Sequence, residues 1–181
     1  MIEVDIKNYS LAEKTDAYNE YLGKKDVVVS HEEGFVEWEV DIPEAGLYNI
    51  SLDYYPLEGR GIDIERALYI NGVMPFSGSD TLTFSRVWTD AGEIRMDNRG
   101  NEIRPTQTEA PRWESTYLRD YMGYYIEPYS YYFNKGKNTI RLVAISEPVA
   151  ISNLVIGQKE ELPSYDEYIA SFDANNYKNT D

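Results

Sequence analysis

The chain has 181 residues, of which 42% are hydrophobic, and a formal net charge of −15. This length fits one domain with a short extension, and the acidic charge argues against nucleic acid or anionic membrane surfaces as partners, because both attract clustered Lys and Arg. No Cys and a single His exclude disulfides, thiol nucleophiles and Cys/His zinc sites. No apolar run is long enough for membrane insertion. The negative charge leaves cations and neutral polar ligands as candidate partners.

The first half of the chain predicts antiparallel strands. Residues 10–25 are compatible with a short helix or a loop. Residues 35–42 alternate strictly between apolar and acidic side chains, which marks a half-buried strand and places Trp38 in the core. The turn "PEAG" at 43–46 leads into a second alternating strand at 47–55. These two strands predict a hairpin.

The middle of the chain is less regular. Residues 66–70 predict a strand that ends at an Asn-Gly turn. Residues 81–88 alternate through Leu82, Phe84 and Trp88, although Arg86 falls on the same face. Residues 89–117 have poor periodicity and many Asp, Asn, Gly and Pro residues, which predicts a long loop. Long loops inside compact domains are often functional.

The last predicted strands follow a tyrosine-rich stretch. Residues 129–133 and 139–145 flank the turn "NKGKN" and predict a second hairpin, and residues 149–157 close the series. The rings expected to face the core from the first of these strands are Tyr129, Tyr131 and Phe133. Tyr125 belongs to the approach to that strand, where its ring is free to line a groove.

The C-terminal segment has the chemistry of a helix start, because Ser164 is followed three residues later by Glu167. We therefore divide the chain into a β module at 1–160 and a helical or polar extension, or linker, at 161–181. Strands joined by turns without interleaved helices predict an all-β fold, an antiparallel β-sandwich followed by a short C-terminal helix.

Three stretches carry a resemblance to a known family: "GFVEWEVDIPEAGLYNISLDYY", "ALYING" and "YYFNKGKNTIRLVAISEPVAISNLVI". Together they resemble the jelly-roll carbohydrate-binding modules of the galactose-binding-like superfamily, of the type in families six and thirty-five. The match covers roughly residues 34–72 and 129–157. The resemblance implies a jelly roll that binds oligo- or polysaccharide without catalysis, on or outside a bacterial cell, covalently linked to neighbouring domains.

A second, narrower resemblance covers "FSRVWTD" to "PRWESTYLRD". This run is similar to an N-terminal module of extracellular solute-binding proteins from bacterial sugar importers, the ABC transporters. The alternative function is then a structural or interdomain docking module without its own sugar site.

The sequence also departs from the family pattern. Family-six modules often place a sugar-binding Asn just before the closing strand, followed by an Asp, and the corresponding residues here are Ala150, then Ser152 and Asn153. The resemblance therefore does not carry over the usual sugar cleft or the usual calcium site. Residues 97–102, "DNRGNE", offer oxygen ligands for calcium, but they lack the spacing of a calcium loop and favour a polar turn. No cofactor or metal ligand is predicted.

Sugar binding needs an aromatic ring against the apolar sugar face and paired donors and acceptors for the hydroxyls. Residues 86–117 contain both kinds of side chain, and nothing in the sequence singles out a catalytic acid–base pair. The candidate ligand-binding residues are Trp113, Tyr117, Gln107, Glu109, Arg112, Trp88 and Tyr125.

Several of these residues keep a structural alternative. Trp113 is either a ligand platform or a plug that packs the loop onto the sandwich, and the pattern does not decide between them. For Trp88 the alternation favours the core. The loop arginines, Arg112 among them, are more typical of surface ion pairs. Gln107 and Glu109 are expected to face the same side of an extended segment.

Overall fold

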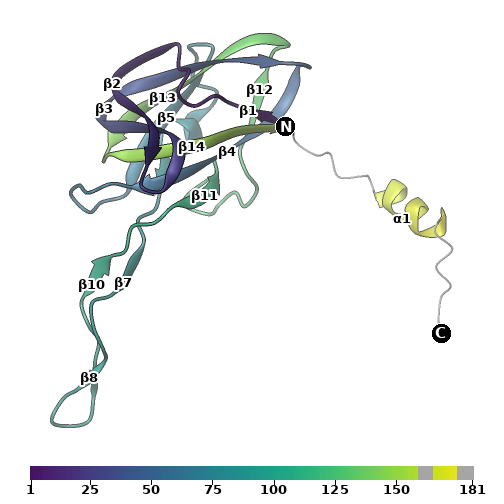
Figure 1. Ribbon diagram of the computed structural model, residues 1–181. Helices are drawn as coiled ribbons and strands as arrows, with labels where there is room; N and C mark the ends of the chain where they lie inside the picture. The colour runs from purple at the N-terminus through teal and green to yellow at the C-terminus, as the bar shows by residue number, and fades with distance from the viewer. Residues whose placement is uncertain (159–164, 175–181) are drawn as a thin grey trace.

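The computed structural model describes residues 1–158 and 165–174, and its main body is a sandwich of antiparallel strands (Figure 1). Alternating side chains supply the apolar inner face of each layer, as predicted. The strands of this body are β1 (Ile2–Glu3), β2 (Leu11–Tyr21), β3 (Lys24–Ile42), β4 (Gly46–Pro56), β5 (Ile64–Ile70), β6 (Leu82–Phe84), β11 (Glu114–Tyr117), β12 (Ser130–Phe133), β13 (Gly136–Ser146) and β14 (Val149–Gln158). A short 3₁₀ helix, η1, covers Ser77–Ser79.

The long strand β3 joins the two layers. Its first half pairs with β14, and its second half pairs with β13, in the overall strand order β11-β4-β14-β3-β13-β5-β6. Gly34 lies between the halves with a φ of 93°, and a Cβ at this position would lie 2.2 Å from the carbonyl oxygen of Glu13. Only glycine fits such a close approach of two backbones, so the crossing depends on this residue.

The core lies between the layers and includes Trp38, which is fully buried as predicted. The indole nitrogen of Trp38 donates to the carbonyl oxygen of Ile6 at 2.7 Å, which fastens the N-terminal segment to the sandwich. Strand β4 directs Leu52 and Tyr54 into the core, so that Asp53 faces outward between them. This alternation gives the outer face of β4 its polar character.

Two expectations outside the predicted strands have different outcomes. Residues 10–25 form neither a helix nor a loop, because Leu11–Tyr21 pairs with β3 as strand β2. Most of its side chains are exposed, so the sequence has no apolar periodicity there. The C-terminal helix is confirmed as α1 (Tyr165–Ala174), while Ser164 of the proposed capping box lies outside the described residues. No helix within residues 1–158 and 165–174 combines the length and apolar character that a membrane crossing requires.

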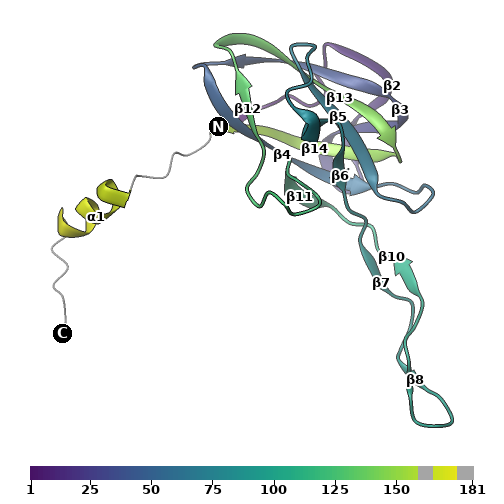
Figure 2. The same cartoon turned by 180° about the vertical axis from the view of Figure 1, so that it is seen from behind.

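The predicted loop at 89–117 instead contains several short paired strands. Residues 87–110 form a hairpin arm that projects from the sandwich, as both views show (Figures 1 and 2). Its paired strands are β7 (Trp88–Asp90) with β10 (Gln107–Glu109), and β8 (Arg95–Met96) with β9 (Glu102–Ile103). Nearly every side chain of these strands is exposed, which explains why hydrophobic alternation did not reveal them.

A buried cluster of charges fixes the base of the hairpin arm. The Arg86 side chain donates to the carboxylates of Glu147 at 2.5 Å and Glu109 at 2.9 Å, and to the carbonyl oxygens of Leu57 and Ile62. Burial pushes the pKa of Glu147 upward, but hydrogen bonds and charge from Arg60 and Arg86 outweigh it and leave the pKa lowered. The cluster thus holds both arm strands where they leave the sandwich.

This cluster also explains a failed expectation at the end of the predicted strand 81–88. Leu82 and Phe84 pack in the apolar core. Arg86 is buried as well, but its side chain binds carboxylates and backbone carbonyls. The strand ends at Phe84, and Trp88 begins the arm with 48% of its surface exposed. The prediction that Trp88 belongs to the core is therefore wrong, because the chain has left the sandwich before reaching it.

Candidate functional site

Strand β11 and the residue before it place three side chains along the outer face of the sandwich. Trp113 immediately precedes β11, and Ser115 and Tyr117 follow at alternate positions, which point to one side of an extended chain. Strand β11 pairs with β4 so that Ser115 lies opposite Asp53. An indole, a hydroxyl and a phenol therefore follow one another beside a carboxylate.

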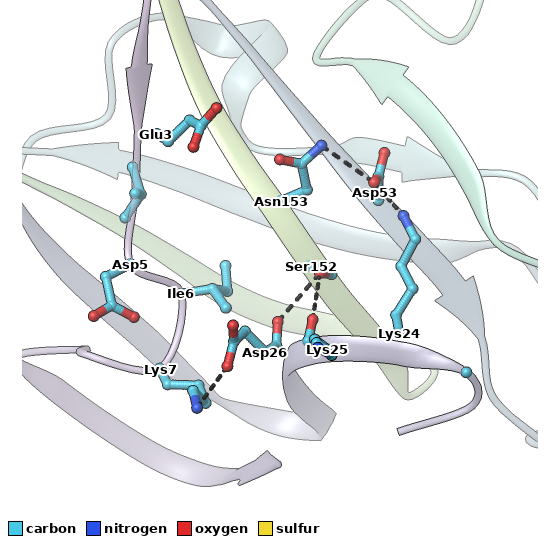
Figure 3. Close-up of a pocket in the computed structure, with 12 residues that line it drawn as sticks. Glu3, Asp5, Ile6, Lys7, Lys24, Lys25, Asp26, Asp53, Ser152 and Asn153 are labelled. Carbon is cyan, nitrogen blue, oxygen red and sulfur yellow. Dashed lines mark hydrogen bonds and ion pairs between the residues drawn. The ribbon is translucent and has the colours of Figure 1, made fainter. Parts of the chain in front are cut away.

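Two hollows in this face meet at Asp53 and Asn153, and we call them together the Asp53 groove. The smaller hollow, of about 420 Å³, is lined by Asp53, Asn153, Ser115, Tyr117 and Arg119, among others. The larger hollow, of about 880 Å³, lies between the segment 3–7, the turn before β3 and strand β14 (Figure 3). Each hollow by itself has a volume in the range of small-molecule sites.

Asp53 is the centre of the polar contacts in the groove. Its carboxylate accepts hydrogen bonds from the Lys24 ammonium, the Ser115 hydroxyl and the Asn153 amide, the last at 3.3 Å (Figure 3). Burial raises the pKa of Asp53, but the donors Lys24, Ser115 and Asn153 overcome this effect, so the pKa lies below its ordinary value. The groove therefore contains an ionised, well-oriented acceptor.

A β-bulge directs Asn153 toward the groove. The register between β14 and β4 shifts between Ser152 and Val155, and Asn153 has a φ of 51°. Asn tolerates this left-handed conformation better than most residues, and bulges often re-aim a side chain. The neighbouring Ser152 hydroxyl lies 3.1 Å from the carbonyl oxygen of Asp26, which links β14 to the beginning of β3 (Figure 3).

Trp113 is both anchored and partly accessible. Its indole nitrogen donates to the carbonyl oxygen of Leu22 at 2.9 Å, and its ring meets Tyr55 at 5.6 Å between centroids. The ring packs over a small apolar cluster that includes the buried Ala150. The Lys24 ammonium lies over the indole, 5.0 Å from its centroid. Trp113 thus lies beside the groove and reaches it through its contact with the Lys24 ammonium.

Solved structures with a similar fold are carbohydrate-binding modules. The family 35 module from Clostridium thermocellum is 16% identical, with a TM-score of 0.50 over 87% of this chain and 98% of that one. The family 35 module from Paenibacillus barcinonensis gives the same values. The fold is that of a carbohydrate-binding module.

A third similar structure is a longer enzyme. The β-(1,4)-mannanase of Podospora anserina, which combines a family 26 glycoside hydrolase with a family 35 module, is 12% identical with a TM-score of 0.55. The match covers 91% of this chain and 29% of the mannanase chain. Neither a protein-family model nor a curated protein matches the chain by sequence. These neighbours do not bear on the expected role in a solute-binding protein.

Of the predicted residues, Tyr117 lines the groove and Trp113 lies beside it, with its ring 5.0 Å from the Lys24 ammonium, whereas the others lie elsewhere. Gln107 and Glu109 lie on one side of the hairpin arm, as expected. Both are already engaged, however, Gln107 with Asp90 and Glu109 with Arg86.

The remaining candidates also have partners elsewhere. Arg112 is exposed and paired with Glu114, in agreement with a surface ion pair. Tyr125 stacks on Tyr129 with centroids 6.3 Å apart, in the aromatic segment that precedes β12.

The structure adds Asp53, Asn153, Lys24 and Arg119, which sequence reasoning missed. The signal for Asp53 was present, because strict alternation in 47–55 places it opposite the apolar face.

The polar turn at 97–102 is held by Asp97, which accepts hydrogen bonds from the backbone nitrogens of Arg99 and Asn101. No cluster of metal-binding side chains occurs among the described residues.

Proposed function

We propose that this chain is a non-catalytic carbohydrate-binding module and that its sugar lies in the Asp53 groove. The observation that carries the proposal is the arrangement on β11 and β4, where Tyr117 lines the same hollow as the Asp53 carboxylate and its hydrogen-bonding neighbours. Trp113 lies beside this hollow, next to Lys24. A pyranose presents the matching features, an apolar face for a ring and hydroxyls for polar groups.

Each lining residue has a defined task in this proposal. Tyr117, 47% exposed, supplies the stacking surface, and Asp53 accepts hydrogen bonds from sugar hydroxyls. Asn153 and Arg119 supply donors from neighbouring elements. Three donors hold the Asp53 carboxylate ionised, which suits an acceptor for sugar hydroxyls.

The proposal extends to the setting of the module. We place it outside the cell as part of a larger sugar-handling protein, with covalently linked neighbouring domains. The mannanase supports this setting, because there the similar region is a fraction of a longer chain. The sequence that flanks this module will distinguish a hydrolase from a transporter component as the larger protein.

Replacing Tyr117 with Ala tests the groove. We expect about tenfold weaker binding of the best ligand in a panel of soluble gluco-, manno-, xylo- and galacto-oligosaccharides, because a lost aromatic contact is worth ~1 kcal/mol or more. Isothermal titration calorimetry measures this change. Tyr124→Ala is the matched control, because Tyr124 is 87% exposed and does not line the groove. The proposal would be contradicted if the wild-type chain bound neither a member of this panel nor a glucosamine oligosaccharide, or if only Tyr124→Ala weakened binding.

A further inference from the structure

The groove already holds one organic cation, the side chain of Lys24. Its ammonium pairs with the Asp53 carboxylate and lies over the Trp113 indole, 5.0 Å from the ring centroid. A carboxylate and an aromatic face are the two groups by which proteins recognise alkylammonium ions, through charge and cation–π attraction. The site is therefore shaped for an ammonium group, and Lys24 shows where that group lies.

The carboxylate is fixed while the cation is exchangeable. The Asp53 side chain is only 10% exposed, and Ser115 and Asn153 hold it from the two adjacent strands. The Lys24 side chain is 33% exposed and reaches Asp53 on a flexible stem from the first residue of β3. The exposed part of the Lys24 side chain leaves its ammonium room to turn toward water. A ligand ammonium can therefore displace the Lys24 ammonium without disturbing Asp53.

Charge on the larger scale favours the same kind of ligand. The chain carries a net charge of −15, which attracts cations over long range. The larger hollow has four carboxylates in its lining, from Glu3, Asp5, Asp26 and Asp53, against the three ammonium groups of Lys7, Lys24 and Lys25.

We propose that the Asp53 groove recognises a sugar with a free amino group, whose ammonium takes the place of Lys24 between Asp53 and Trp113. This inference rests on the proposed function, because it names the class of sugar for the same groove. The adjoining hollow then receives the rest of the oligosaccharide, with Tyr117 against a ring face and Arg119 as a donor to hydroxyls. Glucosamine oligosaccharides are the simplest members of this class.

The test compares two oligosaccharides of equal length, one of glucosamine and one of N-acetylglucosamine, at a pH where the amino groups are protonated. The acetylated sugar keeps the ring and linkage but loses the charge. We expect the wild-type chain to bind the glucosamine oligosaccharide about tenfold more tightly. Calorimetry gives both affinities, and this comparison requires no variant to fold.

Two lysine variants then separate displacement from general charge. Lys24→Met removes the competing ammonium and should tighten glucosamine binding several-fold, with little change for the acetylated sugar. Lys135→Met removes the same charge from an exposed lysine that does not line the groove and should leave the ratio of affinities unchanged. Asp53→Asn should abolish the preference.

Equal affinity of the wild-type chain for the two oligosaccharides would overturn the inference. Weaker glucosamine binding by Lys24→Met would overturn it as well. If a neutral glycan still binds and Tyr117→Ala still weakens that binding, the proposed function survives. If no glycan of either kind binds, both ideas fail together.

Discussion

Arg86→Leu should lower the free energy of unfolding by about 3–5 kcal/mol, because it leaves a buried carboxylate without its closest cation. Glu147 is fully buried, and the Arg86 side chain beside it is 1% exposed. The substitution also removes donors to Glu109 and to two backbone carbonyls. Unfolding in urea, followed by tryptophan fluorescence, measures the change.

Arg60→Ala is the matched control for this prediction. Arg60 also pairs with Glu147, but its side chain is largely exposed. Exposed ion pairs contribute about 0–1 kcal/mol, so this variant should lose far less stability. If the two variants lost equal free energy of unfolding, the burial of the Arg86 charge would not explain the stability of the cluster.

Asp53→Asn should weaken binding of neutral glycans about 10- to 100-fold, because hydrogen bonds to a charged group contribute ~1.5–3 kcal/mol each. The amide keeps the size of the carboxyl group but loses its charge and one acceptor oxygen. Calorimetry with the best ligand from the panel provides the measurement, and an unchanged affinity would place the sugar elsewhere.

The same carboxyl group sets a pH dependence of stability. The pKa of Asp53 is lower in the folded chain than its ordinary value, because the donors Lys24, Ser115 and Asn153 outweigh the effect of burial. Its contribution is therefore fully present above the ordinary pKa and is lost as the pH falls through the folded value. The stability difference between wild type and Asp53→Asn should shrink on acidification, and a constant difference would contradict the assignment.

The sandwich was predictable because its strands are apolar on one face. The alternation in 35–42 and 47–55 identified the strands and the buried Trp38 correctly. Strand β2 and the strands of the hairpin arm were not predicted. The side chains on both of their faces are mostly exposed, so the sequence does not alternate between apolar and polar residues there. Arg86 broke the alternation in the sequence, and its carboxylate partner Glu147 is 61 residues away.

The candidate site was only half predictable for a related reason. Trp113 and Tyr117 were chosen by residue type; Tyr117 lines the groove, and Trp113 lies beside it next to Lys24. Their polar partners depend on which strands become neighbours: Asp53 and Asn153 meet although 100 residues separate them. Gln107 and Glu109 were grouped with Trp113 because they are close in sequence. In the structure both belong to the hairpin arm, which projects away from the sandwich.

The position of the bound sugar is the central claim, and an NMR titration of the isotopically labelled chain with its best glycan tests it most directly. We predict that the largest amide shifts occur on β4, β11 and β14, around Asp53, Ser115, Tyr117 and Asn153. Shifts confined to the hairpin arm at 87–110, or to the aromatic segment around Tyr125, would contradict it.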